Sequence, residues 1–266
     1  MSECEARKIL LKLSLDTMGD WEAMFEKIKN KEKVNINPYE FDDARYDYLT
    51  LIDDKYPTQL KESNRPPFII YYKGDINGLL ESKHFIGVFN DNLASNYSTT
   101  KLLEVLEKLV DTYTFIVRLS TKKDEELISN LLSKGASVVG VLTESIESKM
   151  AQNSTVFKNL RKEHLLITTV PETAKKQSKM TQFECAKTIA SLAEIIVVGA
   201  VAKRSVEMAG IACAIGVCRE IYVLPQLAGS NYENNSLIKN GAHLLESAED
   251  ILEGNRWLWI MMNYIF

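Results

Sequence analysis

Cysteine and histidine are scarce in this sequence, and neither is spaced as a metal site requires. The three histidines lie far apart. The four cysteines, which form no CxxC pair, are Cys4, Cys185, Cys213 and Cys218. Structural zinc sites use such ligands at short, regular spacing, so we expect no metal site and no cofactor. Cysteines without a disulfide pattern are typical of reducing compartments, and we therefore expect a cytoplasmic protein.

A long hydrophobic segment is also missing. The N-terminus is charged throughout and has no apolar core of a signal peptide. The apolar stretch 257–266 is shorter than the roughly 20 residues that a membrane-spanning helix needs. We therefore do not expect this protein to be a membrane protein. We expect residues 255–266 to form an apolar tail that packs on the domain or on a second copy of the chain. Peripheral membrane contact is the alternative for this tail.

Motifs for catalysis and for nucleotide binding are absent from the sequence. No GxGxxG turn follows the first core strand, and no Walker lysine motif occurs anywhere. The scattered histidines and cysteines assemble no specific Ser-His-Asp or Cys-His arrangement. We therefore expect a binding protein rather than an enzyme.

The composition itself is that of an ordinary globular protein. Of 266 residues, 45% are hydrophobic and 26% are charged, which excludes a disordered tail or a fibre. Lysine and arginine number 32 against 36 acidic residues, so the formal net charge is −4. This mild acidity excludes a broadly basic nucleic-acid coat, but it allows a local basic groove.

Short apolar runs alternate with amphipathic stretches beyond residue 80. The predicted strands are 84–89, 113–120, 136–142, 164–170, 194–200 and 219–225. The predicted helices between them are 98–111, 123–134, 182–193 and 203–217. Continuous apolar strands separated by helices predict an α/β fold, a Rossmann-like parallel sheet covered by helices on both faces. We place this domain at 41–254 and a small N-terminal helical domain at 1–40, where apolar residues recur at helical spacing.

This fold predicts where a ligand binds. Ligands of open parallel sheets bind outside the carboxyl ends of the strands, near the topological switch point. The segments that follow the predicted strands are 90–98, 120–125, 143–148, 200–205 and 226–236. They are rich in Asn, Ser, Thr, Lys and Gly, which bind anionic oxygens together with helix N-termini. We therefore expect a ligand that carries phosphate.

Two segments carry a family pattern. Residues 56–80 contain Tyr-Pro, a Leu, Pro-Pro, an aliphatic strand and Lys-Gly, and residues 219–252 contain an Arg, a strand ending in Pro, and Asn-x-Leu-Ile-x-x-Gly-Ala. The matching positions are Tyr56, Pro57, Leu60, Pro66, Pro67, Lys73, Gly74, Arg219, Pro225, Asn235, Leu237, Ile238, Gly241 and Ala242. Over residues 50–253 the chain resembles the DNA-processing protein A family, DprA (also called Smf). The resemblance implies single-stranded DNA binding, delivery of that DNA to the RecA recombinase, a role in natural transformation, and a homodimer.

The ligand-facing motifs depart from this family. Its Gly-Ser-Arg, Arg-Asn-Arg and Ser-Gly-Ser motifs are replaced by Asn90-Asp91-Asn92, Cys185-Ala186-Lys187 and Ser205-Val206-Glu207. After the first of these, Ser95 and Tyr97 still match. The pattern indicates a diverged member of the family.

The candidate binding residues follow from the loops and from this resemblance. We expect phosphate contacts from Lys122, Lys187, Lys203, Arg204 and Arg219. We expect polar contacts from Asn90, Asn92, Ser95, Ser205 and Asn235. Segment 175–187 is a further cationic candidate, with Phe183 available for base stacking. The alternative for the lysines is that they are solvated surface residues, and the alternative for segment 175–187 is a flexible polar loop. The alternative for Asn235 is a helix cap.

The leading hypothesis is a cytosolic protein that binds and protects single-stranded DNA and loads a recombinase onto it. One alternative is a protein that binds a nucleotide or another phosphate ligand at the same edge of the sheet. Another is a scaffold whose ligand site has decayed and whose function is partner binding, as the missing arginines and the apolar tail suggest.

Overall fold

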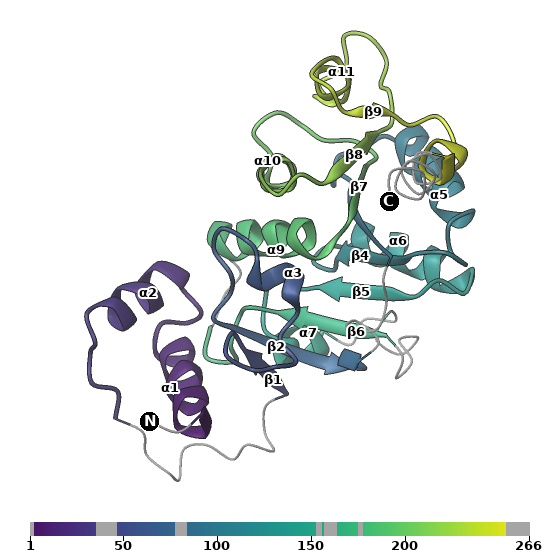
Figure 1. The fold of residues 1–266 in the computed structure, drawn as a ribbon. Coiled ribbons are helices and arrows are strands. Elements are labelled where there is room, and N and C mark those ends of the chain that lie inside the picture. Colours follow the sequence, from purple (N-terminus) through teal and green to yellow (C-terminus); the bar gives the residue numbers. More distant parts are fainter. Residues whose placement is uncertain are drawn as a thin grey trace, which may run out of the picture.

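The computed structural model describes residues 3–35, 47–77, 84–152, 156, 164–174 and 178–253. Nine strands form one sheet at its centre: β1 (Tyr48–Thr50), β2 (Ile69–Gly74), β3 (Phe85–Phe89), β4 (Thr114–Arg118), β5 (Val138–Val141), β6 (Leu165–Thr168), β7 (Ile195–Val198), β8 (Glu220–Val223) and β9 (His243–Leu244). Their order across the sheet is β1-β2-β6-β5-β4-β3-β7-β8-β9 (Figure 1). The apolar runs predicted as strands are β3 to β8.

Strands β3 to β9 pair in parallel, and β1 and β2 extend one edge in the antiparallel sense. The prediction of a Rossmann-like sheet is confirmed, with the correction that the sheet is mixed. Strand β3 lies inside the sheet, where Gly87 pairs with Ile116 of β4 on one side and with Ile196 of β7 on the other.

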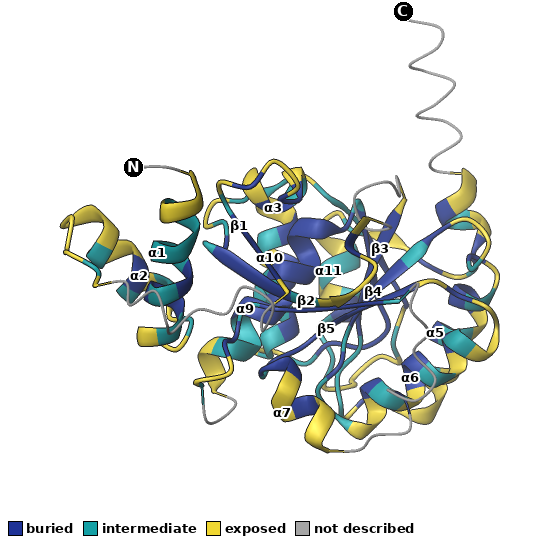
Figure 2. Cartoon of the chain, turned by 90° about the horizontal axis from the view of Figure 1, so that it is seen from below, coloured by how far each residue is buried: buried dark blue, intermediate teal, exposed yellow. Residues whose placement is uncertain are grey.

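Helices cover both faces of the sheet (Figure 2). The helices are α1 (Glu3–Asp16), α2 (Trp21–Lys29), α3 (Thr58–Lys61), α5 (Asn96–Glu107), α6 (Lys122–Ser133), α7 (Ile146–Ala151), α9 (Lys179–Leu192), α10 (Val206–Gly216) and α11 (Asn234–Lys239). One core cluster joins the apolar sides of α5, α6 and α7 to the sheet, and a second joins α3, α9 and α10 to its other face. The four helices predicted beyond residue 80 are confirmed as α5, α6, α9 and α10, with ends displaced by a few residues.

The N-terminal helices α1 and α2 lie beside the β1 and β2 edge (Figure 1). The Tyr71 hydroxyl donates to Ser14 Oγ of α1 at 3.0 Å. The Trp21 indole N–H of α2 donates to the Pro66 carbonyl at 2.9 Å, and its ring stacks on Phe68 with centroids 5.3 Å apart. These contacts fix the predicted helical segment to the sheet.

Two motif positions of segment 56–80 are structural. The buried Tyr56 donates its hydroxyl to the Pro67 carbonyl at 2.7 Å, and burial raises the pKa of that hydroxyl. Gly74 ends β2 with a φ of +111°, and a Cβ there would lie 2.0 Å from the His164 carbonyl oxygen. Only glycine fits this position, so Gly74 has a structural role at the end of β2.

Among the residues that the structure describes, each helix is too short or too polar to cross a lipid bilayer. The predicted tail, 255–266, lies outside the described residues.

Candidate functional site

The topological switch point of the sheet lies at β3. From β3 the chain proceeds to β4 on one side, and it returns through β7 on the other side. The loops after β3, β4, β7 and β8 therefore meet where the parallel strands end, a region called here the carboxyl edge. Direct contacts join them: the Asp91 N–H donates to the Ala200 carbonyl at 2.8 Å. The edge at which the sequence predicts ligand binding is thus assembled from the expected loops.

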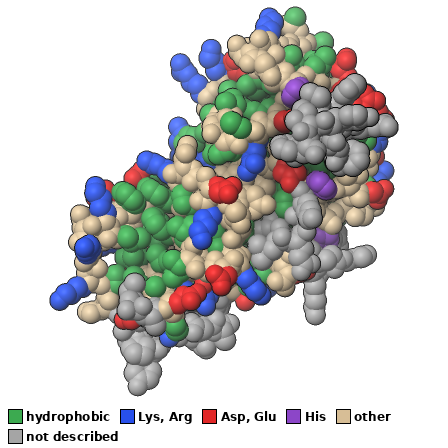
Figure 3. Space-filling view, viewed as in Figure 1, with side chains coloured by type: hydrophobic (Ala, Val, Ile, Leu, Met, Phe, Trp, Pro, Cys, Tyr) green, Lys and Arg blue, Asp and Glu red, His purple; other side chains and the backbone are tan. Residues whose placement is uncertain are grey.

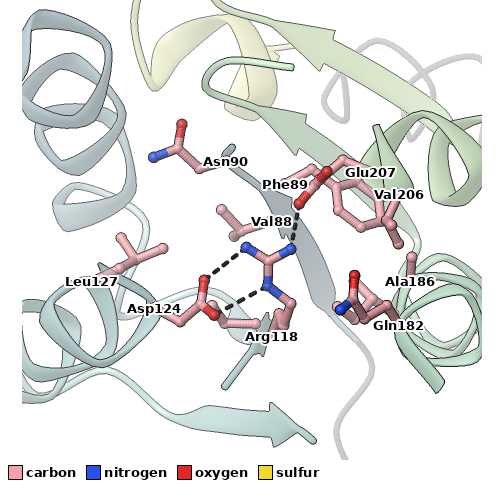
Figure 4. Close-up of a pocket in the computed structure, with 12 residues that line it drawn as sticks. Val88, Phe89, Asn90, Arg118, Asp124, Leu127, Gln182, Ala186, Val206 and Glu207 are labelled. Atoms are coloured by element: carbon pink, nitrogen blue, oxygen red, sulfur yellow. Dashed lines mark hydrogen bonds and ion pairs between the residues drawn. The ribbon is translucent and has the colours of Figure 1, made fainter. Parts of the chain in front are cut away.

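Arg118, the last residue of β4, lies at the centre of this edge, and its side chain is only 16% exposed. Its Nε and Nη2 donate to the two carboxylate oxygens of Asp124, each at 3.1 Å. Its Nη1 donates to the carboxylate of Glu207 (Figure 4). The two carboxylates come from the first turns of α6 and α10, and Asp124 also accepts the backbone N–H of Thr121 at 2.8 Å.

These ion pairs determine the charge at the centre of the edge. Burial alone lowers the pKa of Arg118, but the carboxylates of Asp124 and Glu207 outweigh it and raise that pKa above its ordinary value. The guanidinium therefore stays charged, and one positive charge faces two negative charges, for a sum of −1. Arg118 is not available as a free cation for an anionic ligand.

The asparagines after β3 have different surroundings. Asn92 Oδ1 accepts from Arg118 Nη2 at 3.0 Å and from Thr121 Oγ1 at 2.8 Å, so Asn92 belongs to the ion-pair cluster. Asn90 points away from the guanidinium (Figure 4), and its Nδ2 donates to Thr99 Oγ1 at 3.4 Å. Within the described part of the chain, the buried Asn90 Oδ1 has no hydrogen-bond partner.

The cavity beside Arg118 is small. Residues from β3, β4, α6, α9 and α10 line it, among them Asn90, Gln182 and Glu207. Its volume of about 20 Å³ holds little more than a water molecule. A mononucleotide does not fit at this point of the switch crevice.

Three of the predicted cations are exposed on those loops. Lys122 opens α6, and Lys203 and Arg204 lie in the loop after β7, where Arg204 has a φ of +61°. The neighbouring Lys123 donates from Nζ to the Ala94 carbonyl at 3.2 Å. On the face drawn in Figure 3, lysine and arginine side chains are scattered among acidic and apolar ones. The charge on the drawn face is therefore mixed.

The two predicted serines are helix caps. Ser95 Oγ accepts the Ser98 N–H at 3.1 Å at the start of α5. Ser205 Oγ accepts the Met208 N–H at 3.3 Å at the start of α10. Both helices begin at the carboxyl edge, so their N-termini face the same side as the exposed cations.

Two predicted cations have structural partners. Arg219 precedes β8 and therefore lies at the amino-terminal end of the strands, opposite the carboxyl edge, where its Nη2 donates to the Ser191 carbonyl at 3.1 Å. It cannot supply a phosphate contact at the carboxyl edge, and we correct that expectation. Lys187, in the second half of α9, pairs with Glu184 at 2.7 Å. In the cationic segment 175–187, residues 175–177 lie outside the described residues, and Phe183 is half-buried.

Asn235 holds a loop in place. Its Nδ2 donates to the Gln226 carbonyl at 2.7 Å, and its Oδ1 accepts the Gln226 N–H at 2.9 Å. The alternative, a helix cap, does not hold, because Asn235 lies inside α11, whose N-cap residue is Glu233. Asn235 therefore closes the loop after β8 on itself.

Sequence reasoning missed the residue that joins these loops. Asn234 is fully buried; its Oδ1 accepts the Val201 N–H at 3.0 Å, and its Nδ2 donates to the carbonyls of Gly199 and Leu224 at 3.0 and 2.9 Å. It fastens the loop after β7 to the loop after β8. The adjacent Asn235 matched the motif, and nothing in the pattern distinguishes the buried asparagine from its neighbour.

The described residues contain no group of three His, Cys, Asp or Glu side chains that could hold a metal ion. The carboxyl edge is thus a surface of loops with exposed cations, helix N-termini and a neutralised arginine at its centre. Such a surface can bind an anionic polymer through hydrogen bonds and phosphate contacts.

Comparison with known proteins identifies the family. The model of the DNA recombination-mediator protein A family matches residues 47–256. No curated protein sequence matches the chain. DNA processing protein A (DprA) from Streptococcus pneumoniae has a solved structure that superposes with a TM-score of 0.70 at 18% identity, over 95% of this chain and 98% of that chain.

The DNA processing protein A of Helicobacter pylori, whose structure was described for its unique single-stranded DNA binding mode, superposes with a TM-score of 0.66 at 17% identity. That match covers 79% of this chain and 96% of the other. At such identities the superpositions establish a common fold. Because the family model spans most of the sequence, the chain belongs to the DNA recombination-mediator protein A family.

Proposed function

We propose that this protein binds single-stranded DNA across the carboxyl edge of its sheet, without catalysing a reaction on it. The observation that carries the proposal is the placement of Lys122, Lys203 and Arg204, which are exposed on the loops on either side of the neutralised Arg118. Membership of a DNA-processing family and the DNA binding described for the Helicobacter pylori protein support it. Phosphates are the natural partners of such cations.

The ion-pair cluster defines how this binding works. Since Arg118 is held by two carboxylates, phosphate contacts have to come from the surrounding loops. Ser95 and Ser205 bring the N-termini of α5 and α10 to the same surface. Few phosphate contacts make the affinity modest and strongly dependent on salt, with little sequence preference.

We further propose that the bound strand is protected and passed to a RecA-type recombinase, in the cytoplasm and in the course of natural transformation, by a homodimer of this chain. The support for these steps is the family to which the chain belongs.

The test is fluorescence anisotropy with labelled oligo-dT at low salt. The double variant Lys203→Gln, Arg204→Gln removes two exposed cations of the carboxyl edge. The matched control is Lys108→Gln, Lys134→Gln, which removes two exposed cations at the other ends of α5 and α6. We expect the first variant to bind about tenfold more weakly, and the control to bind within about twofold of the wild type. Wild-type protein that fails to bind at tens of micromolar, or equal losses in both variants, would contradict the proposal.

A further inference from the structure

Two loops of the carboxyl edge expose large apolar side chains. Leu93, before α5, is 81% exposed; Tyr97, in the first turn of α5, is 61% exposed; and Leu227, after β8, is 82% exposed. Single exposed apolar residues are common on protein surfaces. These three, however, lie on neighbouring loops of one candidate site.

The two loops are joined by hydrogen bonds beside these side chains. The Tyr232 hydroxyl donates to the Leu93 carbonyl at 2.8 Å. The Ser98 hydroxyl donates to Gln226 Oε1 at 2.9 Å, and these residues directly follow Tyr97 and precede Leu227. The loops 90–98 and 226–233 therefore form one continuous surface, and little ordering is required when a ligand binds.

Cations border this apolar surface on two sides. On one side Lys123 reaches the Ala94 carbonyl at 3.2 Å, next to Leu93. On the other side Ala202 forms a β-bridge with Tyr232, and the exposed Lys203 follows it directly. The nearby carboxylate of Asp91 accepts the Leu93 N–H at 2.7 Å and is engaged within its own turn.

Apolar side chains between cations match the chemistry of single-stranded DNA, in which bases alternate with phosphates. A second copy of this chain fits less well, because its own cations at this edge would face those of the first copy. We propose that Tyr97, supported by Leu93 and Leu227, is the platform on which a base of the bound strand stacks. This inference rests on the proposed function and deepens it. Phe183, the aromatic residue favoured from sequence, is half-buried on α9 and offers less of its ring.

The experiment compares two strands of equal length, oligo-dT and an abasic strand, by anisotropy at low salt. Tyr97→Ala removes the ring, Tyr97→Phe keeps it, and Ile215→Ala is the control, a residue 59% exposed at the far end of α10. We expect Tyr97→Ala to bind oligo-dT about tenfold more weakly, and the other two variants to bind within about twofold of the wild type. On the abasic strand all four proteins should bind alike.

Two results would overturn the platform. One is a Tyr97→Ala protein that binds oligo-dT like the wild type. If light scattering also shows that this variant has a different oligomeric mass, Tyr97 belongs to a contact between copies of the chain instead. The other is an equal loss on both strands, because a role in base stacking requires a base. In either case wild-type binding to oligo-dT would leave the proposed function standing, whereas a wild type that binds neither strand would contradict the proposed function itself.

Discussion

Arg118 illustrates how single side chains determine the character of the carboxyl edge. Its guanidinium bonds both oxygens of Asp124 and the carboxylate of Glu207, and all three side chains are largely buried. Breaking such a cluster by removing one member leaves uncompensated buried charge. The contacts that order the loops after β3, β4 and β7 thus also make the Arg118 guanidinium unavailable for binding a ligand.

Replacing Arg118 by alanine should therefore destabilise the protein strongly. We expect a loss of about 3–5 kcal/mol in the free energy of unfolding, measured by urea denaturation, because two buried carboxylates would remain without their cation. Arg65, whose pair with Glu22 is about half exposed, is the matched control. Arg65→Ala should cost less than about 1 kcal/mol. Similar losses in the two variants would mean that the buried cluster does not hold the edge together.

Cys185 gives a prediction about pH. Its thiol donates to the Val141 carbonyl at 3.5 Å, and burial raises its pKa from 9.0 to about 12, although Arg118 acts in the other direction. The unfolded chain therefore loses this proton at a lower pH than the folded chain does. The thiol contributes its full stability below pH 9, and that contribution is lost as the pH rises from 9 towards 12.

Between pH 9 and pH 10, the wild type should accordingly lose about 1 kcal/mol more stability than Cys185→Ala. Urea denaturation of both proteins at the two pH values measures the difference. Parallel losses would show that the Cys185 thiol does not titrate differently in the folded and unfolded states.

At the scale of elements, the sequence predicts most of the sheet because its central strands are buried on both faces. Strands β3, β5 and β7 consist of buried residues throughout, so they appear as continuous apolar runs. Strands β1 and β9 have only three and two residues. The pairing of these strands and the antiparallel direction of β2 depend on contacts between residues that are distant in the sequence. No local sequence pattern predicts such contacts.

The candidate site was predictable at the level of loops rather than of side chains. The direction of parallel strands placed the loops at 90–98, 200–205 and 226–236 at one edge, since all of them follow strands. The same rule places Arg219, which precedes β8, at the other edge. The partnership of Arg118 with Glu207, 89 residues away, could not be predicted, because long-range side-chain contacts leave no local pattern.

Gly74 tests the packing between elements. A Cβ at this position would meet the backbone of His164, and the positive φ adds strain for any other residue. Gly74→Ala should lose about 3 kcal/mol or more of stability in thermal or urea unfolding. Gly216, where an added Cβ would meet no atom within 4 Å, is the matched control, and Gly216→Ala should stay within about 1 kcal/mol of the wild type. Equal stability of both variants would contradict the close approach of β2 and β6.

For the whole molecule, the formal charge of −4 and the proposed affinity for DNA are compatible, because the cations in question are few and local. Long-range attraction contributes little to such a protein, and direct phosphate contacts have to supply the binding. The number of those contacts can be measured, because each phosphate neutralised on a single strand contributes about −0.7 to the slope of log K against log salt.

The most direct test of the account is this salt dependence, measured with oligo-dT on the wild type and on the Lys203→Gln, Arg204→Gln variant. Contacts from Lys122, Lys203 and Arg204 predict a slope of about −2 for the wild type and of about −0.7 for the variant. The Lys108→Gln, Lys134→Gln control should keep the slope of the wild type. Binding that does not depend on salt, or slopes that are the same in wild type and variant, would contradict the assignment of DNA binding to the carboxyl edge.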